Sequence, residues 1–361
     1  MQVIRDFLKT FQITDTTFAV GVSGGADSLA LALMFKQEFP QYRIIALTVD
    51  HKLRPTSGDE AEYVAQVMQK HNIEHHILVW EGEKPQTGIE EQARLARYKL
   101  LCGWCKENNI ANLVIAHHLF DQAETFLMRL QRGSGLYGLS AISEVSERNG
   151  VRILRPLLNT HPDEMKNFLN AQNIKWMEDE SNLCTDFLRV KLRQYLPCLE
   201  REAGITAKRL CEAAADLRKI KGFIEDTVDE IINSKVHKWG DCGFSFDYAE
   251  FLSWHKELRF YILRKLLTTL GGLDYSPEAD SLNTLSEQLS ATAFSGATLG
   301  CCQILKDELK IWIIKENRTN KDICSTEEWE RYTKQNPEVR NIKIPYKLRA
   351  AMFFEKLSKK I

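Results

Sequence analysis

Short apolar runs and longer amphipathic segments alternate along the first third of the chain. The runs are rich in Val, Ile and Leu and occupy residues 18–22, 43–49, 75–79 and 112–116. Apolar side chains at helical spacing fill the segments between them, at residues 28–39, 58–71 and 88–108. Because strands alternate with helices, the pattern predicts an α/β fold with a doubly wound parallel sheet, which binds ligands at the carboxyl ends of its strands.

The rest of the chain follows a different pattern. Long helices are expected from residue 205 to residue 270. Two or three strands are expected within 295–314, at 298–305 and 309–314. Residues 340–361 carry seven basic side chains and one acid, Glu355, which predicts a poorly packed basic tail. We therefore expect an α/β domain at 1–204, a helical and small α+β domain at 205–318, and a tail at 319–361.

A loop rich in Ser and Gly connects the first strand to the first helix of the sheet. Gly24 and Gly25 have no Cβ, so their backbone can turn N–H groups toward an anion. Ser23 and Ser28 add hydroxyl donors, and the following helix directs the positive end of its dipole to the same point. Bare phosphate repels the Asp27 carboxylate, so Asp27 is expected to bind a Mg²⁺ ion that bridges it to the phosphates. The alternative is a plain turn before a helix.

Composition excludes some classes of protein. The chain has 361 residues, of which 44% are hydrophobic and 27% charged, as in ordinary globular proteins of two or three domains. No run approaches the roughly 20 apolar residues of a membrane span, and residues 1–11 do not resemble a signal peptide. The nine cysteines are odd in number and scattered, so we expect reduced thiols and a cytoplasmic location. The net charge of −1 does not exclude a local basic patch, because a patch can occur within a neutral total.

Polar residues also follow the second strand and lie on the third helix. Ser57 and Glu60 have the spacing of a capping box. His51, in the same loop, is assigned to nucleotide binding because loops at this edge commonly carry function. Arg94 and Arg97 are one helical turn apart, where they either face solvent or grip a phosphate or carboxylate.

The fourth strand ends in a sequence with two histidines and two acids. Asp121 and Glu124 are three residues apart in a first helical turn, so both carboxylates lie on one face. They either cap the helix or bind an amine or a metal. On the preceding helix, Cys102 and Cys105 form a lone Cys-x-x-Cys, for which we expect thiols packed in the core rather than a metal site.

Taken together and in order, seven motifs resemble those of the tRNA(Ile)-lysidine synthetases. The motifs are Ser-Gly-Gly-Ala-Asp-Ser at 23–28, Asp-His-x-Leu-Arg-Pro-x-Ser at 50–57, Ala-Arg-Leu-Ala-Arg-Tyr at 93–98, Ala-His-His-x-x-Asp-Gln-Ala-Glu-Thr at 116–125, Arg-Gly-Ser-Gly-x-x-Gly-Leu at 132–139, Arg-Pro-Leu-Leu at 155–158 and Asp-x-Ser-Asn at 179–182. The first of them resembles the PP-loop of ATP pyrophosphatases.

This resemblance implies a fold, a reaction and its cofactors. The fold is the N-type ATP pyrophosphatase fold, which is adenine nucleotide alpha hydrolase-like. The reaction uses ATP and Mg²⁺ to activate C2 of the wobble cytidine of a tRNA(Ile) with a CAU anticodon. The ε-amine of free L-lysine then displaces AMP and forms lysidine. The implied enzyme is a ligase that makes a carbon–nitrogen bond.

The resemblance also implies roles for individual residues. ATP would be bound by Ser23, Gly24, Gly25, Ala26, Asp27, Ser28 and His51. The implied catalytic residues are Asp27, Arg97, His117, Asp121 and Glu124. Asp121 and Glu124 would recognise the lysine ammonium, and His117 or His118 would assist its deprotonation. Lysine or tRNA would be contacted by Arg94, Arg97, Asp121, Glu124, Arg189 and Arg193.

An excess of basic residues supports an RNA partner. Residues 187–221 contain nine basic and four acidic side chains, which is either a solvated helical face or a surface for an RNA backbone. The residues from 205 onward resemble the second domain of the family, which helps to hold tRNA. The expected partners are tRNA(Ile) with a CAU anticodon and free lysine, without a membrane, and a homodimer is left open.

Two departures from the family pattern keep other readings open. Phe120 stands where the family usually has the first of two consecutive aspartates, and Val190 stands where it usually has an asparagine. A catalytically silent tRNA-binding protein is therefore one alternative. Another is a PP-loop tRNA thiolase with an iron–sulfur cluster at Cys102 and Cys105, although such thiolases usually have Lys where Ala26 stands.

Overall fold

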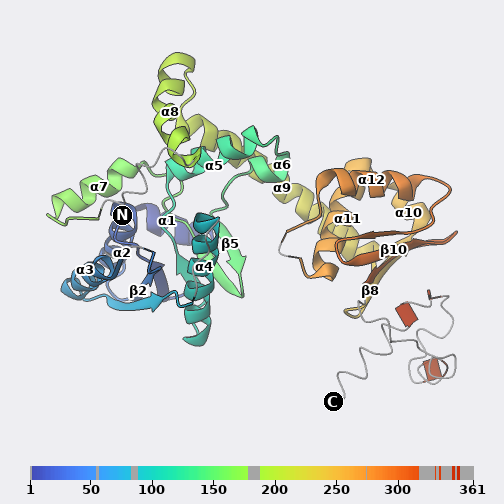
Figure 1. Ribbon diagram of the computed structural model, residues 1–361, viewed down its shortest axis with the longest axis horizontal. Coiled ribbons are helices and arrows are strands. Elements are labelled where there is room, and N and C mark those ends of the chain that lie inside the picture. The colour runs from blue at the N-terminus through green and yellow to red at the C-terminus, as the bar shows by residue number, and fades with distance from the viewer. Residues whose placement is uncertain are drawn as a thin grey trace. The chain divides into compact units, whose positions relative to one another are not determined.

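The computed structural model describes most of the chain. The described residues are 2–53, 57–82, 88–177, 188–273 and 275–316, with 330, 333–334, 344–345 and 348–349. The chain divides into two compact units, residues 1–221 and 222–361, and the division falls within helix α9 (Ala207–Lys235) (Figure 1). The three domains expected from the sequence stay a proposal.

A six-stranded sheet forms the centre of the first unit. Its strands lie in the order β3-β2-β1-β4-β6-β5, and all neighbours are parallel except the edge pair β5 and β6. In the register of the central strands, Val20 of β1 lies opposite Ala46 of β2 and Val114 of β4. The predicted doubly wound α/β sheet is confirmed. The strands are β1 (Thr17–Gly21), β2 (Arg43–Asp50), β3 (Glu74–Val79), β4 (Asn112–Val114), β5 (Val145–Arg148) and β6 (Val151–Leu154).

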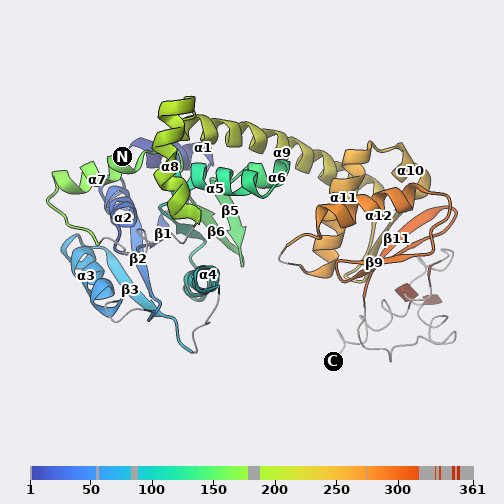
Figure 2. The same cartoon turned by 45° about the horizontal axis from the view of Figure 1, so that its top comes forward.

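Helices cover both faces of this sheet. One core joins a face of the sheet to α1 (Gln2–Thr10), α2 (Ala26–Glu38), α3 (Ser57–Lys70) and α7 (Pro162–Ala171). A second core joins the opposite face to α4 (Ile89–Glu107) (Figure 2). A third core, beside the sheet, joins α5 (Leu119–Gln131), α6 (Leu136–Leu139), α8 (Leu188–Ala203) and the start of α9.

Helix α2 is buried on all sides, which fits its apolar sequence. Leu29, Leu31 and Phe35 have no exposed surface, as expected of a helix that is hydrophobic all round. The helix begins at Ala26, two residues before the predicted start, because Gly25 has the extended conformation of an N-cap residue. Ala26 and Asp27 therefore belong to the first helical turn.

Helix α3 also begins differently from the prediction. Ser57 is its first helical residue rather than its N-cap, and its hydroxyl bonds to the carboxylate of Asp50. The preceding motif residues 54–56 lie outside the described part of the chain. The bond from Ser57 instead joins the start of α3 to the end of β2.

The second unit is built on an antiparallel sheet. Its strands lie in the order β7-β8-β11-β10-β9, and α11 and α12 pack on one face. The strands are β7 (His237–Trp239), β8 (Gly243–Asp247), β9 (Ala297–Leu299), β10 (Cys302–Lys306) and β11 (Lys310–Lys315). The helices are α10 (Tyr248–Ser253), α11 (Lys256–Gly271) and α12 (Ala279–Ser290).

The prediction of helices from 205 to 270 is wrong over β7 and β8. Gly240 turns the chain between the two strands with a φ of 56°, a conformation that favours glycine. Phe244 and Phe246 are buried in β8, and the Trp239 indole donates a hydrogen bond to the Ser245 hydroxyl at 2.9 Å. β7 has only three residues, too few to show an alternation of apolar and polar side chains. β8 does alternate at Phe244, Ser245, Phe246 and Asp247, a strand signal that the helical prediction did not use.

The opposite face of this second sheet is covered in part by residues that were expected to lie in a poorly packed tail. Ile344 and Leu348 are 2% and 0% exposed and pack with Trp239 and Trp312. The expectation of poor packing is therefore wrong at these two positions. The other residues of 335–361, apart from Pro345 and Arg349, lie outside the described part of the chain.

Shortening the side chain of Leu348 should destabilise the second unit. Leu348→Ala removes buried apolar contacts and leaves a cavity, so the free energy of unfolding should fall by about 2–5 kcal/mol. Urea unfolding followed by tryptophan fluorescence measures the change. Leu309→Ala, at a side chain that is 76% exposed, is the control and should leave stability nearly unchanged. Equal effects of the two variants would contradict this packing.

Within the described residues, no helix has both the length and the apolar character that crossing a membrane requires.

Candidate active site

The direction of the strand order reverses between β1 and β4. β1 is followed along the sheet by β2 and β3 on one side, and by β4 and β6 on the other. A crevice opens outside the carboxyl ends of the strands at such a reversal, where the loops diverge to opposite faces. The Ser- and Gly-rich loop follows β1, and the His-His sequence follows β4. The fold therefore brings the two strongest motifs of the sequence to one place.

The loop after β1 is braced by its own side chains. The Ser28 hydroxyl donates to the Gly25 carbonyl at 3.1 Å and accepts the Ser23 backbone N–H at 3.0 Å. Ser28 is therefore a structural part of the loop, because its only hydroxyl proton is used there. Gly24 has a φ of +89°, and a Cβ at this position would lie 3.3 Å from Val64 of α3. The loop shape thus needs glycine at position 24.

A distant segment also holds this loop. The Met177 backbone N–H donates to the Gly24 carbonyl at 3.0 Å, and the Tyr63 hydroxyl donates to the Lys175 carbonyl at 2.7 Å. The chain after α7 is thereby fixed against both the loop and α3. The Asp-x-Ser-Asn motif at 179–182 follows directly, but it lies outside the described residues.

One carboxylate oxygen of Asp27 has no hydrogen-bond partner among the described residues. This oxygen, Oδ1, is buried, while Oδ2 lies 3.6 Å from His118 Nε2. Burial raises the pKa of Asp27, although the charge of His118 acts in the opposite direction. A buried carboxylate oxygen with no donor is a chemically suitable ligand for Mg²⁺. Asp27 thus fits the metal that the sequence led us to expect.

His118 caps helix α5 and faces Asp27 at the same time. Its Nδ1 accepts the backbone N–H groups of Phe120 at 3.2 Å and Asp121 at 3.4 Å. The Asp121 carboxylate completes a capping box, because it accepts the His118 backbone N–H at 3.0 Å. Because Nδ1 is an acceptor, the ring proton is on Nε2, which points toward Asp27 and Asp121.

His117 is held by an arginine from the end of β6. Arg155 is buried, and its Nε donates to His117 Nδ1 at 3.1 Å. The other end of its guanidinium donates to the Ser143 carbonyl at 2.8 Å and to the Ser146 hydroxyl at 3.0 Å. Burial lowers the pKa of His117 to about 4, so the ring is neutral at pH 7 and carries its proton on Nε2. His117 is thereby prepared to donate a hydrogen bond from Nε2.

This arrangement can be checked by NMR. We expect the His117 ring to stay neutral, with the proton on Nε2, down to about pH 4. Since an unfolded histidine binds its proton near pH 6.5, the unfolded state binds more protons between these values, and His117 lowers stability as the pH falls from about 6.5 to 4. Ring ¹⁵N shifts across pH 4–8 measure both tautomer and pKa, with His117→Gln to identify the signal. A His117 pKa near 6.5 would contradict the assignment.

Glu124 is fully buried between two arginines of α8. Arg193 Nε lies 2.6 Å from Glu124 Oε1, and Arg189 Nε lies 3.3 Å from Oε2. Arg193 also approaches Asp121 Oδ1 at 4.0 Å. Burial raises the pKa of Glu124, and the hydrogen bond and charge of Arg193 oppose that shift. Burial alone would raise the pKa of Asp121 as well, but the charges of His118 and His117 outweigh it and the pKa is lowered.

The interactions of Asp27, His118, Asp121, Glu124 and the two arginines form one continuous cluster. The predicted pair Asp121 and Glu124 lies in it, as do Arg189 and Arg193 from α8. Asp121 has a capping role in addition to any role with a ligand, and Glu124 already pairs with two guanidinium groups. The two acids are therefore brought together as the spacing predicted, with partners that the spacing did not reveal.

Arg94, Arg97 and His51 lie apart from the contacts of this cluster. Arg97 Nε donates to His51 Nε2 at 3.4 Å, and the His51 ring meets Trp80 edge-on with centroids 5.8 Å apart. Arg94 is exposed and pairs with Glu91 at 3.6 Å. The charge of Arg94 still contributes to the lowered pKa of His117, so Arg94 lies near the cluster without an observed contact to it.

Phe120 and Val190, the two residues that differ from the family pattern, lie among packed side chains or in a buried position. Phe120 packs edge-on against His161, with centroids 4.9 Å apart, and lies 6.2 Å from the His118 ring. Val190 is buried on α8, where it is 8% exposed. Phe120 thus has an aromatic neighbour, and Val190 occupies a buried position.

The two cysteines of the Cys-x-x-Cys sequence lie in the core, as predicted. Cys102 and Cys105 have no exposed surface and pack beneath the sheet with Tyr98 and Leu101. Burial raises the pKa of the Cys105 thiol to about 12, so it is not a thiolate at neutral pH. Over the described parts of the chain, no group of three or more His, Cys, Asp or Glu side chains is arranged to hold a metal.

Three contributions to the site were not predicted from the sequence. Arg155 belongs to a recognised motif, but nothing in its spacing indicates that it bonds to His117. Met177 contributes a hydrogen bond from its backbone N–H, which the identity of its side chain does not indicate. His118 was considered as a proton acceptor, whereas its position before the first turn of α5 is the available signal that it caps the helix.

The chain is similar in sequence to known proteins. The chain matches the PP-loop domain family over residues 1–199. It is 35% identical to tRNA(Ile)-lysidine synthase from Wolbachia pipientis wMel over 84% of this chain and 72% of that protein. It is 32% identical to tRNA(Ile)-lysidine synthase from Wolbachia sp. subsp. Brugia malayi (strain TRS) over 89% of this chain and 75% of that protein.

A solved structure shares the fold. The U34-tRNA thiolase NcsA from Methanococcus maripaludis, solved with its [4Fe-4S] cluster, superposes with a TM-score of 0.52. The two chains are 19% identical, and the match covers 60% of this chain and 77% of that chain. This likeness supports the fold alone, whereas the sequence matches to the two Wolbachia proteins extend over most of the chain. The chain belongs to the tRNA(Ile)-lysidine synthase family.

Proposed function

We propose that the chain uses ATP to join free L-lysine to C2 of the wobble cytidine of a tRNA(Ile) with a CAU anticodon. The observation that carries this proposal is the meeting of an anion-binding loop and a cluster of two acids and two arginines at one reversal of the strand order. The loop suits a nucleotide, and the cluster suits an amino acid with charges of both signs.

In the first step, the C2 oxygen of cytidine attacks the α-phosphorus of ATP. The bond to the bridging oxygen breaks, pyrophosphate leaves and an adenylated cytidine forms. The N–H groups of the loop and the first turn of α2 would hold the phosphates, and the His117 Nε2–H would donate to the developing charge. A Mg²⁺ ion, when bound at Asp27, supplies further charge neutralisation. We propose Ser23, Gly24, Gly25, Ala26 and His51 as the remaining ATP contacts.

In the second step, the lysine ε-amine attacks C2, the bond from C2 to the phosphate oxygen breaks, and AMP leaves. Asp121 and Glu124 would recognise the ammonium group. Arg189, Arg193, Arg94 and Arg97 would contact a carboxylate or phosphates, in addition to the partners they have in the structure. The backbone N–H groups of Phe120 and Asp121 already donate to His118 Nδ1, and the Arg155 guanidinium donates to His117 Nδ1. Either histidine can accept the ammonium proton only after the hydrogen bond to its Nδ1 breaks. Deprotonation of the lysine ammonium by a histidine therefore requires a local rearrangement.

The basic residues of α8 and α9 would bind the RNA backbone. Arg201, Lys208 and Lys219 are exposed on these helices, as electrostatic contacts to phosphates require. The second unit would contribute further contacts. A cytoplasmic location and the oligomeric state, including a homodimer, stay predictions.

Lysine incorporation tests the proposal directly. Incubation with ATP, labelled lysine and tRNA(Ile) bearing a CAU anticodon should place label in the RNA and release AMP and pyrophosphate. The same tRNA with uridine at the wobble position is the control and should stay unlabelled. Binding of tRNA without lysine-dependent AMP release would instead identify a silent tRNA-binding protein. Iron in the purified protein together with sulfur transfer would identify a thiolase.

A further inference from the structure

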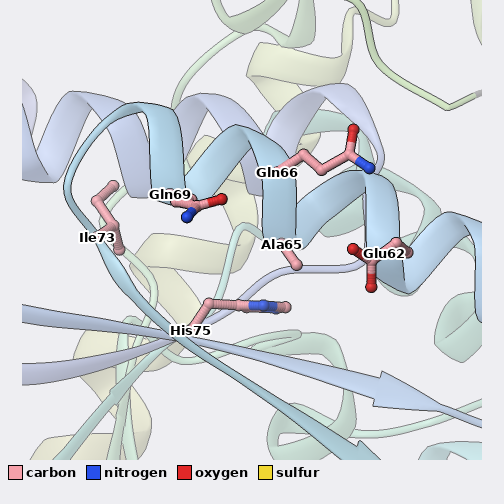
Figure 3. Close-up of a pocket in the computed structure, with 6 residues that line it drawn as sticks. All are labelled: Glu62, Ala65, Gln66, Gln69, Ile73 and His75. Atoms are coloured by element: carbon pink, nitrogen blue, oxygen red, sulfur yellow. The ribbon is translucent and has the colours of Figure 1, made fainter.

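A cavity of about 300 Å³ lies between α3 and β3, outside the contacts of the candidate active site. Figure 3 shows its lining, in which the His75 ring and the Glu62 carboxylate both lie between α3 and the strands beneath it. β3 is an edge strand of the sheet, so the cavity opens at the border of the first unit. The lining residues are Glu62, Ala65, Gln66, Gln69, Ile73 and His75.

Hydrogen bonding fixes the tautomer of His75. The Thr48 hydroxyl donates to the Val22 carbonyl at 2.8 Å, and it has only one proton to give. His75 Nε2 lies 2.8 Å from the same hydroxyl oxygen and must therefore be the donor in that contact. Burial lowers the pKa of His75 to about 4, so the ring is neutral at pH 7. Nδ1 is thus an acceptor, and no described residue donates to it.

The remaining lining favours a cation with a short apolar part. Glu62 supplies a carboxylate, and Gln66 and Gln69 supply amide oxygens. Ala65 and Ile73 supply apolar surface. None of the six lining residues is Lys or Arg, so nothing in the lining competes for the acceptors. An ammonium group has three N–H donors and no acceptor, which complements this set.

The cavity is also connected to the nucleotide loop. The hydrogen bonds from His75 to Thr48 and from Thr48 to Val22 end at the carbonyl directly before Ser23. Thr48 is buried, so water does not compete for these bonds. Helix α3 forms a second connection. Val64 lies 3.3 Å from the position that a Cβ on Gly24 would occupy, and in the sequence it stands between the lining residues Glu62 and Gln66.

We propose that this cavity binds a primary alkylammonium ion and that its occupation changes the affinity of the loop for ATP. The ammonium group would donate to His75 Nδ1 and the Glu62 carboxylate, and its alkyl chain would lie on Ala65 and Ile73. The site is separate from the one proposed for substrate lysine. Neither binding nor its effect on ATP requires RNA, so failure here and failure of the proposed function are distinguishable.

Pentylammonium chloride is a suitable probe, and 1-pentanol is its uncharged control. We expect pentylammonium, but not pentanol, to shift the His75 ring signals saturably in NMR spectra at pH 7, with His75→Gln to identify them. Glu62→Gln should weaken the binding about fivefold, the size expected for one exposed charge pair. Glu81→Gln, at an exposed acid outside the lining, is the matched control and should leave binding unchanged.

The effect on ATP is measured by calorimetry with and without saturating pentylammonium. We expect the ATP dissociation constant to change at least twofold, with an equal change in pentylammonium affinity when ATP is saturating. Thr48→Val, which removes the bonded hydroxyl, should abolish this change while pentylammonium still binds. Absence of saturable binding, an equal response to pentanol, or unchanged affinity in Glu62→Gln would overturn the site. An unchanged ATP affinity would overturn the connection to the loop.

Discussion

Asp27→Asn should remove most adenylation of RNA while the fold is retained. Asp27 Oδ1 is buried, no described residue donates to it, and we propose it as the Mg²⁺ ligand beside the phosphates. A metal ion contributes several kcal/mol of charge stabilisation to such a reaction, and each 1.4 kcal/mol is about a tenfold change in rate. The rate of AMP transfer should therefore fall about 100-fold or more. Single-turnover release of labelled pyrophosphate from ATP measures it.

Stability separates this loss from misfolding. Burial raises the pKa of Asp27, which means that the folded protein holds this charge at a cost. The amide has no charge, so Asp27→Asn should leave the melting temperature unchanged or raise it. Asp59→Asn, at an exposed acid in the first turn of α3, is the matched control and should change neither rate nor stability. An Asp27→Asn enzyme with a normal rate would show that Asp27 is not the metal ligand.

Much of the first unit follows from local sequence patterns. Four apolar runs predict four of the strands at nearly their observed bounds, and the motifs after residues 21 and 116 predict which loops meet. Parallel strands buried on both faces are near-continuous apolar runs, which makes them easy to recognise. The unpredicted strands β5, β6 and β7 carry charged residues within them, such as Glu147, Arg152 and Lys238, so they do not form such a run.

The sequence predicts which residues lie in the site better than it predicts their hydrogen bonds and ion pairs. The spacing of Asp121 and Glu124 places both acids on one face of α5, and the structure agrees. The partners of Glu124 come from α8, and the partner of His117 comes from β6. Such pairings depend on how separate elements pack, and no local pattern contains that information. The histidine tautomers follow only from those pairings, and they decide whether a ring donates or accepts a proton.

Arg193→Leu should destabilise the first unit, because it leaves the buried Glu124 carboxylate with Arg189 alone. The Glu124 side chain has no exposed surface, while the arginine side chain is 36% exposed. Removal of one partner from a buried charge pair is costly, and the partial exposure of Arg193 reduces the expected loss of unfolding free energy to about 2–3 kcal/mol. Lys191→Met, at an exposed cation on the same helix, is the matched control and should cost almost nothing.

A second substitution separates the structural role of this pair from its role with lysine. The double variant Arg193→Leu with Glu124→Leu no longer buries an unpaired charge, so urea unfolding should show most of the lost stability restored. Lysine transfer to adenylated RNA should stay at least about tenfold below normal, because the ammonium has lost one of its two carboxylates. If transfer returned along with stability, Glu124 would be only a partner that holds α8 in place, and recognition of the lysine ammonium would rest on Asp121.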